Sequence, residues 1–246
     1  MGRLSNRRKA HLANMAKARS AQRSGEIGKL LIGLEDRLNH IKNTKKEWLN
    51  KNRSRNMNVF TCWNFQVGRS YYFPTNVNVN AKKFYDMVDT TDGRRAYVYK
   101  FMESTNKEDW MKALYSEYLL PLIHFVDKEW SGPDNEWMCQ INIMDYGEDR
   151  EHAVKEHKDT HDRSHQYAVV LGSYTGAKFE TYTKKNESDL WSMDLRNKVV
   201  KVDGRYHHRV TPIKSGTRFS LYYYKQFDRR YIKQPKLWPP EIVFAY

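Results

Sequence analysis

Apolar residues repeat with a helical period near the N-terminus of the chain and in short, strand-like runs in its second half. Four apolar residues recur at spacings of three and four: Leu31, Leu34, Leu38 and Ile41. This spacing predicts a helix that buries one face against the rest of the protein. Residues 1–28 have little apolar periodicity, so we expect them to be disordered or to form a helix only on a partner.

The middle of the chain favours two strands followed by a helix. Runs rich in β-branched and aromatic residues predict strands at 58–65 and 96–101. A capping box formed by Thr105 and Glu108 predicts the start of a helix. Pro121 lies inside the apolar pattern of that helix, so we expect a kink or a break there.

Short runs with strand preference dominate the second half and are separated by turn residues. They cover residues 137–144, 167–173, 178–183, 198–202 and 217–225. Many short strands in this arrangement favour a sandwich or barrel. Three prolines in residues 226–246 predict an extended tail that wraps the core. We divide the chain into a basic arm and helix over 1–56 and a main domain over 57–246.

The positive charge is concentrated at the N-terminus. The chain carries a net charge of +14, and residues 1–55 hold 15 Lys or Arg against 4 Asp or Glu. Such an arm is attracted to phosphates without reading sequence, which favours a nucleic-acid partner, in the first place DNA. A solvated basic tail, a localisation signal or a mitochondrial transit peptide are the alternatives.

The cysteines and the apolar runs indicate the compartment. Cys62 and Cys139 lie far apart and form no disulfide framework, which suits an intracellular, reducing compartment, the nucleus in a eukaryote. No run approaches the roughly 20 apolar residues of a membrane span, and no secretory signal is visible, so we expect no membrane partner. We expect a monomer.

One short motif carries candidate metal chemistry. His157-Lys158-Asp159 places an imidazole and a carboxylate on the same side of a turn, and His208 from a distant strand can complete a three-ligand face. Two histidines and one carboxylate with open positions are the ligand set of non-haem Fe(II) oxygenases. Arg218 and Ser220 point to one face of a strand, where together they can grip a carboxylate.

These residues resemble the Fe(II)/2-oxoglutarate dioxygenase superfamily, whose pattern is His-x-Asp, a distal His and an Arg ten positions later, often as Arg-x-Ser. The segment 169–176, Val-Val-Leu-Gly-Ser-Tyr-Thr-Gly, looks like a conserved stretch of the TET/JBP-like nucleic-acid base dioxygenases, although Ala177 stands where that family usually has glycine. The resemblance covers about residues 137–226.

The resemblance implies an α+β fold with a double-stranded β-helix (jelly-roll, cupin-like) core, flanking helices and a basic N-terminal arm. It implies an oxidoreductase that uses Fe(II), 2-oxoglutarate and O₂ to oxidise the 5-methyl group of a pyrimidine, 5-methylcytosine in DNA. Iron would be held by His157, Asp159 and His208. The same resemblance gives Arg218, Ser220 and Asn142 a role in binding 2-oxoglutarate, although Asn142 could contact the base instead. It also places Asp162 and Tyr224 at the flipped base.

Several alternatives remain open at this level. His157, His161 and His165 would share one face of a helix and could hold zinc. His207 competes with His208 as distal ligand, and Lys214 competes with Arg218 for the co-substrate. The substrate could instead be thymine, RNA, protein or a small molecule. The chain could also be a basic nucleic-acid-binding module without catalysis.

Overall fold

The computed structural model describes most of the second half of the chain and selected segments of the first. The described residues are 6–45, 50–51, 62–68, 71–72, 85–89, 95–99, 109–131, 137–145, 152–160, 162–225 and 233–245. Within them, no helix is long and apolar enough to cross a membrane.

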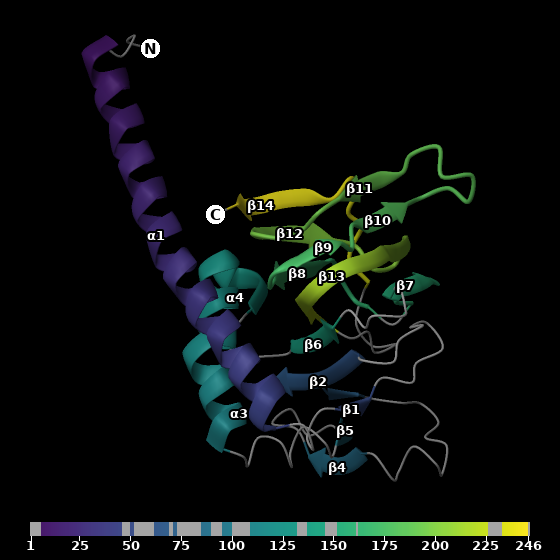
Figure 1. The fold of residues 1–246 in the computed structure, drawn as a ribbon. Helices are drawn as coiled ribbons and strands as arrows, with labels where there is room; N and C mark the ends of the chain where they lie inside the picture. The colour runs from purple at the N-terminus through teal and green to yellow at the C-terminus, as the bar shows by residue number, and fades with distance from the viewer. Residues whose placement is uncertain are drawn as a thin grey trace.

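The helix α1 (Asn6–Thr44) lies along one side of the molecule, and its N-terminal end projects beyond the rest of the protein (Figure 1). Its predicted apolar face is confirmed, because Leu31, Leu34, Leu38 and Ile41 are each at most 1% exposed. The helix begins at Asn6 and so includes residues 6–28, while the expectation that residues 1–28 are disordered or helical only on a partner stays a prediction. Ala, Arg and Lys are strong helix formers, and a helix anchored by packing extends easily into such a sequence.

A broken helix packs beside α1. It consists of α3 (Asp109–Leu114), a π-helical turn (Tyr115–Leu119), α4 (Leu120–Val126) and α5 (Lys128–Ser131). The predicted break at Pro121 is confirmed, because Pro121 lies in the first turn of α4, directly after the π turn. Proline at that place removes only an N–H that α4 itself does not use. The predicted helix start near Thr105 lies outside the described residues.

The larger antiparallel sheet has the strand order β1-β2-β6-β13-β8-β12-β14. Its strands are β1 (Asn50–Lys51), β2 (Cys62–Gly68), β6 (Met138–Asp145), β8 (Gln166–Leu171), β12 (Lys198–Val202), β13 (His207–Tyr224) and β14 (Glu241–Ala245). The predicted extended tail thus ends as a strand, because 241–245 pairs with the edge of β12. A separate sheet contains β3 (Tyr71–Tyr72), β5 (Arg95–Tyr99) and β4 (Tyr85–Asp89).

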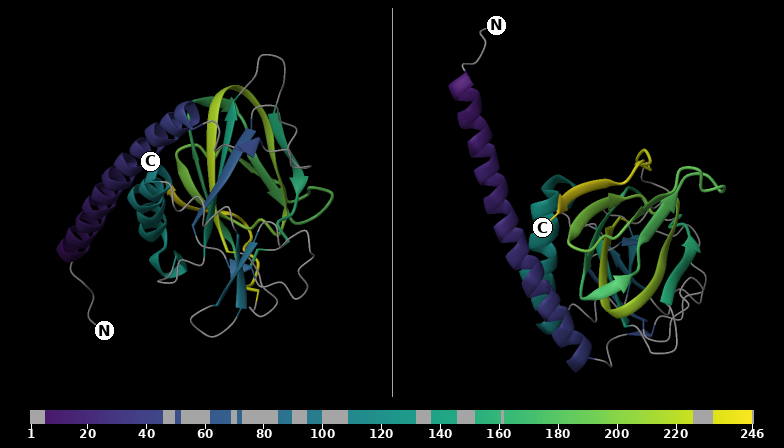
Figure 2. Two further views of the ribbon diagram at one scale, coloured as in Figure 1. Left: turned by 90° about the horizontal axis from the view of Figure 1, so that it is seen from below. Right: turned by 45° about the horizontal axis from the view of Figure 1, so that its top comes forward.

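A smaller layer forms around the first half of β13. It contains β7 (His152–His157), β9 (Tyr174–Gly176), β10 (Phe179–Tyr182) and β11 (Trp191–Met193). Strand β13 pairs with β7, β10 and β9 over residues 207–216 and with β6 and β8 over residues 217–224. Because β13 passes from one layer into the other, the two layers form a double-stranded β-helix, with the helices covering the larger sheet (Figure 2).

Glycine makes the passage between the layers possible. Gly216 adopts a φ of +81°, and a Cβ there would collide with the Ser173 carbonyl. Ala177 also has a positive φ of 54°, so the glycine of the similar family is replaced without loss of the left-handed conformation. Lys42 of α1 holds β13 at this passage, because it pairs with Asp145 and donates to the Thr217 hydroxyl at 3.0 Å.

Side-chain alternation along the strands separates two cores. Phe219, Leu221 and Tyr223 of β13 point outward and pack with α1 and α4 in the larger cluster. Tyr222 of the same strand packs with the cluster between the two layers, which also contains Val170. Even-numbered residues of this part of β13 therefore face the interior of the barrel, where Arg218 and Ser220 lie.

Candidate metal centre

The three predicted ligands come from two adjacent strands and the turn that follows one of them. His157 is the last residue of β7, as the sequence predicts, and Asp159 follows two positions later. His208 lies near the start of β13, directly opposite His157 in the strand register. Antiparallel pairing thus brings together residues that are 51 positions apart, with the two imidazole centroids 4.2 Å from each other.

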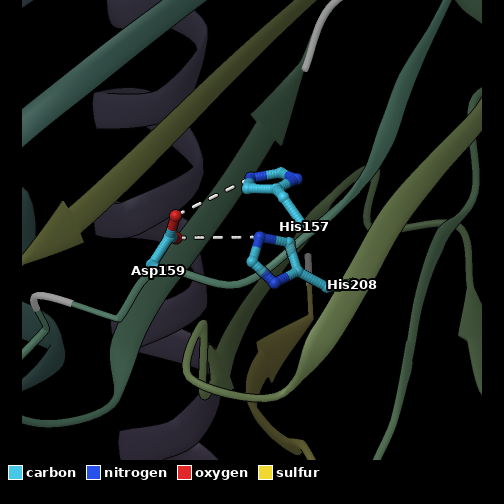
Figure 3. A group of neighbouring side chains, drawn as sticks. All are labelled: His157, Asp159 and His208. Atoms are coloured by element: carbon cyan, nitrogen blue, oxygen red, sulfur yellow. Dashed lines mark ion pairs between the residues drawn. The ribbon is translucent and has the colours of Figure 1, made fainter. Parts of the chain in front are cut away.

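The ligand atoms of these residues converge (Figure 3). Nε2 of His157 lies 3.7 Å from Oδ1 of Asp159, and Nε2 of His208 lies 3.6 Å from Oδ2 of the same carboxylate. One ligand atom from each residue fits within 4.8 Å of the others. Within the described part of the chain, this is the one group of His, Cys, Asp or Glu side chains with such a geometry.

Hydrogen bonds from the far side of each ring fix the imidazoles. Nδ1–H of His157 donates to the Lys155 carbonyl at 2.8 Å, and Nδ1–H of His208 donates to the Tyr206 carbonyl at 3.1 Å. Both bonds select the tautomer whose Nε2 carries a lone pair toward Asp159. Burial lowers the pKa of His208 and keeps it neutral, as metal binding requires.

Asp159 is held from two directions. Its backbone N–H donates to the Gly204 carbonyl at 2.7 Å, and Nε2 of Gln166 donates to its Oδ2 at 2.9 Å. A Cβ on Gly204 would lie 2.6 Å from that same Oδ2, so only glycine lets the turn approach this closely. The carboxylate orientation therefore depends on Gly204 and Gln166.

Asp162 lies behind Asp159, and its side chain is buried. Gln166 bridges the two carboxylates, because its Nε2 donates to Asp162 as well as to Asp159. Burial, followed by the nearby charge of Asp159, raises the pKa of Asp162 well above its usual value. A substrate contact by Asp162 stays a prediction, and the contact observed here is the one to Gln166.

A buried cation lies on the same barrel interior. Arg218 is 1% exposed, and its Nε and Nη2 have no hydrogen-bond partner among the described residues. The neighbouring Ser220 is fully buried, and its hydroxyl is also unpaired there. The guanidinium carbon lies 5.9 Å from the ring centroid of Tyr174, whose cluster also contains Phe179, which stacks on His208. An unpaired buried guanidinium requires an anion, which a bound carboxylate would supply.

The two remaining predicted residues lie on the larger sheet. Asn142 of β6 is opposite Ser220 in the register, is 5% exposed and accepts a hydrogen bond from Gln140 at 3.0 Å. Tyr224 is buried against Met138 at the end of β13. The structure thus places Asn142 beside Ser220, and it leaves a role of Tyr224 toward substrate as a prediction.

The geometry does not favour the competing interpretations of the histidines and of Lys214. His157 ends strand β7, and the described residues 158–160 and 162–165 contain no helix, so the helical face that a zinc site would need is not found there. His207 points away from the site and contacts Glu156 at 2.7 Å, because neighbouring strand residues face opposite sides. Lys214 is exposed, whereas Arg218 is buried in the barrel.

The donor set fits a ferrous ion and a dicarboxylate. Two oriented imidazoles and one carboxylate on one side are the ligands that leave open positions on an octahedral metal. The unpaired Arg218 and Ser220 supply the charge and hydroxyl that a distant carboxylate needs. Sequence reasoning missed Gln166, Gly204 and Tyr174, although a Gly between Asp203 and Arg205 is a recognisable turn signal.

Several solved structures match parts of this chain at low sequence identity. A 2OG-Fe(II) oxygenase family oxidoreductase from Burkholderia pseudomallei is 17% identical, with a TM-score of 0.35 over 59% of this chain and 69% of that one. A prolyl-4-hydroxylase from Pseudomonas putida is 13% identical, with a TM-score of 0.41 over 81% and 87% of the chains. NgTET1, solved with 5mC DNA, is 16% identical, with a TM-score of 0.38 over 79% and 68%. No family model and no curated protein matches the sequence.

Proposed function

We propose that this protein is an Fe(II)- and 2-oxoglutarate-dependent dioxygenase. The observation that carries the proposal is the combination of a converged His157–Asp159–His208 group with a buried, unpaired Arg218 in one barrel. Either feature alone has a structural explanation. A metal-ligand face and an anion pocket on the same interior surface correspond to the two ends of a 2-oxo dicarboxylic acid.

Each side chain has a defined task in this proposal. His157, Asp159 and His208 hold the metal, and the backbone bonds of the two imidazoles keep their Nε2 lone pairs aimed at it. Arg218 and Ser220 bind the far carboxylate of 2-oxoglutarate, with Asn142 next to them on β6. Ferrous iron bound there supplies the redox chemistry that couples the decarboxylation of 2-oxoglutarate to the oxidation of a substrate C–H bond.

The overall reaction balances without a further reductant. One O₂, one 2-oxoglutarate and one substrate C–H give succinate, CO₂ and a substrate hydroxyl. One oxygen atom enters the new carboxylate of succinate and the other enters the substrate. The apolar cluster around Phe179, Tyr174 and Val210 excludes water from the inner side of the site.

We further propose a 5-methylpyrimidine in DNA, in the first place 5-methylcytosine, as the substrate. The support is the similarity of segment 169–176 to base dioxygenases, together with 15 Lys or Arg in residues 1–55. Part of this basic segment lies on the end of α1 that projects from the body, where it could contact the phosphate backbone of DNA (Figure 1). A methyl group in the duplex is reached only after the base is flipped out.

The test is turnover with nucleoside mass spectrometry. The protein is incubated with Fe(II), 2-oxoglutarate, ascorbate and DNA containing 5-methylcytosine, beside His208→Ala and the matched neighbour variant His207→Ala. We expect oxidised cytosine and succinate with wild type and His207→Ala, and neither with His208→Ala. Succinate without oxidised cytosine would move the substrate to thymine, RNA, protein or a small molecule. No succinate from the wild-type protein would refute the oxygenase and favour a binding module.

A further inference from the structure

One four-residue turn holds two of the three candidate ligands. In the turn Asp203–Tyr206, the carbonyl of Gly204 accepts from the Asp159 backbone N–H at 2.7 Å. Two residues later, the carbonyl of Tyr206 accepts from Nδ1 of His208 at 3.1 Å. The turn is closed by a bond from the Tyr206 N–H to the Asp203 carbonyl at 3.1 Å. Any displacement of this turn would move Asp159 and His208 together.

A buried ion pair joins this turn to the C-terminal tail. Arg205 forms a fork with Asp203, with Nε to Oδ1 at 2.8 Å and Nη2 to Oδ2 at 2.6 Å. Its remaining N–H groups donate to the carbonyls of Gln234 at 2.7 Å, Pro235 at 3.1 Å and Arg163 at 3.4 Å. The side chains of Arg205 and Asp203 are 5% and 0% exposed. Asp203 also accepts from the Leu237 N–H at 2.9 Å, so the tail contacts both charges.

The same tail also holds the segment that follows Asp159. Nζ of Lys233 donates to the Thr160 carbonyl at 3.0 Å, and the Gln234 N–H donates to the Arg163 carbonyl at 3.0 Å. The tail therefore connects the segment just after Asp159 with the turn just before His208. Each of these bonds from the tail spans 29 or more positions in the sequence.

We propose that residues 233–237 are a strap that positions the metal ligands, with Arg205 as its central positioning residue. The inference rests on the proposed metal site and adds a dependence of metal affinity on a tail whose described hydrogen bonds go to residues other than the ligand side chains. Because coupling between two sites is reciprocal, metal binding must also stabilise the docked tail. Partners that orient metal ligands typically change metal affinity by about 10- to 100-fold.

The first experiment compares two arginines that form forked ion pairs. Co(II) is titrated into the metal-free protein, and its visible spectrum reports affinity and ligand geometry. Arg205→Lys keeps the charge but loses the fork, so we expect affinity to fall by about 10- to 100-fold with an altered spectrum. Arg209→Lys changes an equivalent fork to Glu180 and Glu187 on the outer face, and we expect wild-type affinity. Equal Co(II) affinities for the wild type and both variants would refute the strap but leave the proposed metal site standing.

The second experiment uses the wild-type chain and needs no variant to fold. Amide hydrogen exchange is measured with and without Co(II). We expect the metal to slow exchange at Gln234 and Leu237 as well as at Asp159, with little change in β14. Protection confined to the ligand segments would refute the strap even if Arg205→Lys is unfolded. A wild-type protein that binds no Co(II) would refute the proposed metal site, and the strap with it.

Discussion

The two faces of β13 carry similar residue types, but the charged side chains on them have different partners. On the outer face, His207 contacts Glu156 at 2.7 Å, while Arg209 contacts Glu180 at 2.7 Å and Glu187 at 2.9 Å. On the inner face, His208 directs Nε2 at the Asp159 carboxylate, 3.6 Å away in the ligand group, and Arg218 leaves two of its nitrogens unpaired among the described residues. The outer groups are satisfied by the protein itself, whereas the inner groups are arranged for something that binds.

This difference separates structural charges from functional ones. A buried polar group without a partner costs free energy, so a folded chain seldom keeps a charged one unless a ligand or a bound water supplies the missing contact. By residue type alone, His207 and His208 would be equal candidates for a metal ligand, and Arg209 and Arg218 equal candidates for binding a carboxylate. The following variants test whether the two faces really differ in this way.

The largest effect is expected from the paired histidines. His208→Ala removes a ligand, so metal affinity should fall by more than about 100-fold, beyond the loss typical of an outer partner. His207→Ala removes a surface contact one residue away and should leave metal binding unchanged. Isothermal titration with Co(II) measures both. Similar losses in the two variants would contradict the assignment of inner and outer faces.

The next effect is expected from the buried arginine. Arg218→Met should weaken 2-oxoglutarate binding by about 2–5 kcal/mol, the usual cost of removing one partner of a buried charge pair. The same change should stabilise the ligand-free fold, because it replaces an uncompensated buried charge by an apolar side chain. Co-substrate titration and thermal unfolding give the two values.

Lys214→Ala is the matched control for Arg218, since Lys214 is an exposed cation on the same strand. The Lys214→Ala variant should change neither the affinity for 2-oxoglutarate nor the thermal stability. If Arg218→Met lowered stability and left 2-oxoglutarate binding intact, Arg218 would be a structural residue.

A smaller effect is expected from a single added methyl group. Gly204→Ala would place a Cβ 2.6 Å from Oδ2 of Asp159, which turns the carboxylate and should lower metal affinity by about tenfold. Gly28→Ala, on α1, meets no atom within 4 Å and should stabilise the helix by about 1 kcal/mol without affecting the metal. Co(II) titration and chemical denaturation distinguish the two. Unchanged affinity in Gly204→Ala would show that the turn tolerates a side chain.

The smallest effect is expected on the outer face. Arg209→Ala removes ion pairs of a partly exposed side chain, so unfolding free energy should fall by no more than about 1 kcal/mol. Metal and 2-oxoglutarate binding should stay at the wild-type level. A large loss of metal binding would mean that the outer network also positions the ligands.

Much of the site was predictable because its residues follow simple periodicities. The strand period of two predicts that Arg218 and Ser220 share a face, and it separates His207 from His208. The helical period predicts the buried face of α1 over Leu31–Ile41. The supports of Asp159 could not be predicted, since Gly204 reaches Asp159 only through packing between distant segments. The bond from Gln166, seven positions further on, depends on how the turn after Asp159 folds.

The sequence by itself determined the ligand types, their spacing and the positive charge of the N-terminal segment. Only the tertiary structure decided that β13 passes through both layers, that the helix begins at Asn6, and that the tail ends as β14 and holds the Asp203–Tyr206 turn. The physical reason is the range of the interactions. Periodicity and turn preferences act between neighbours in the chain, whereas metal-ligand geometry depends on hydrogen bonds between segments far apart in the sequence.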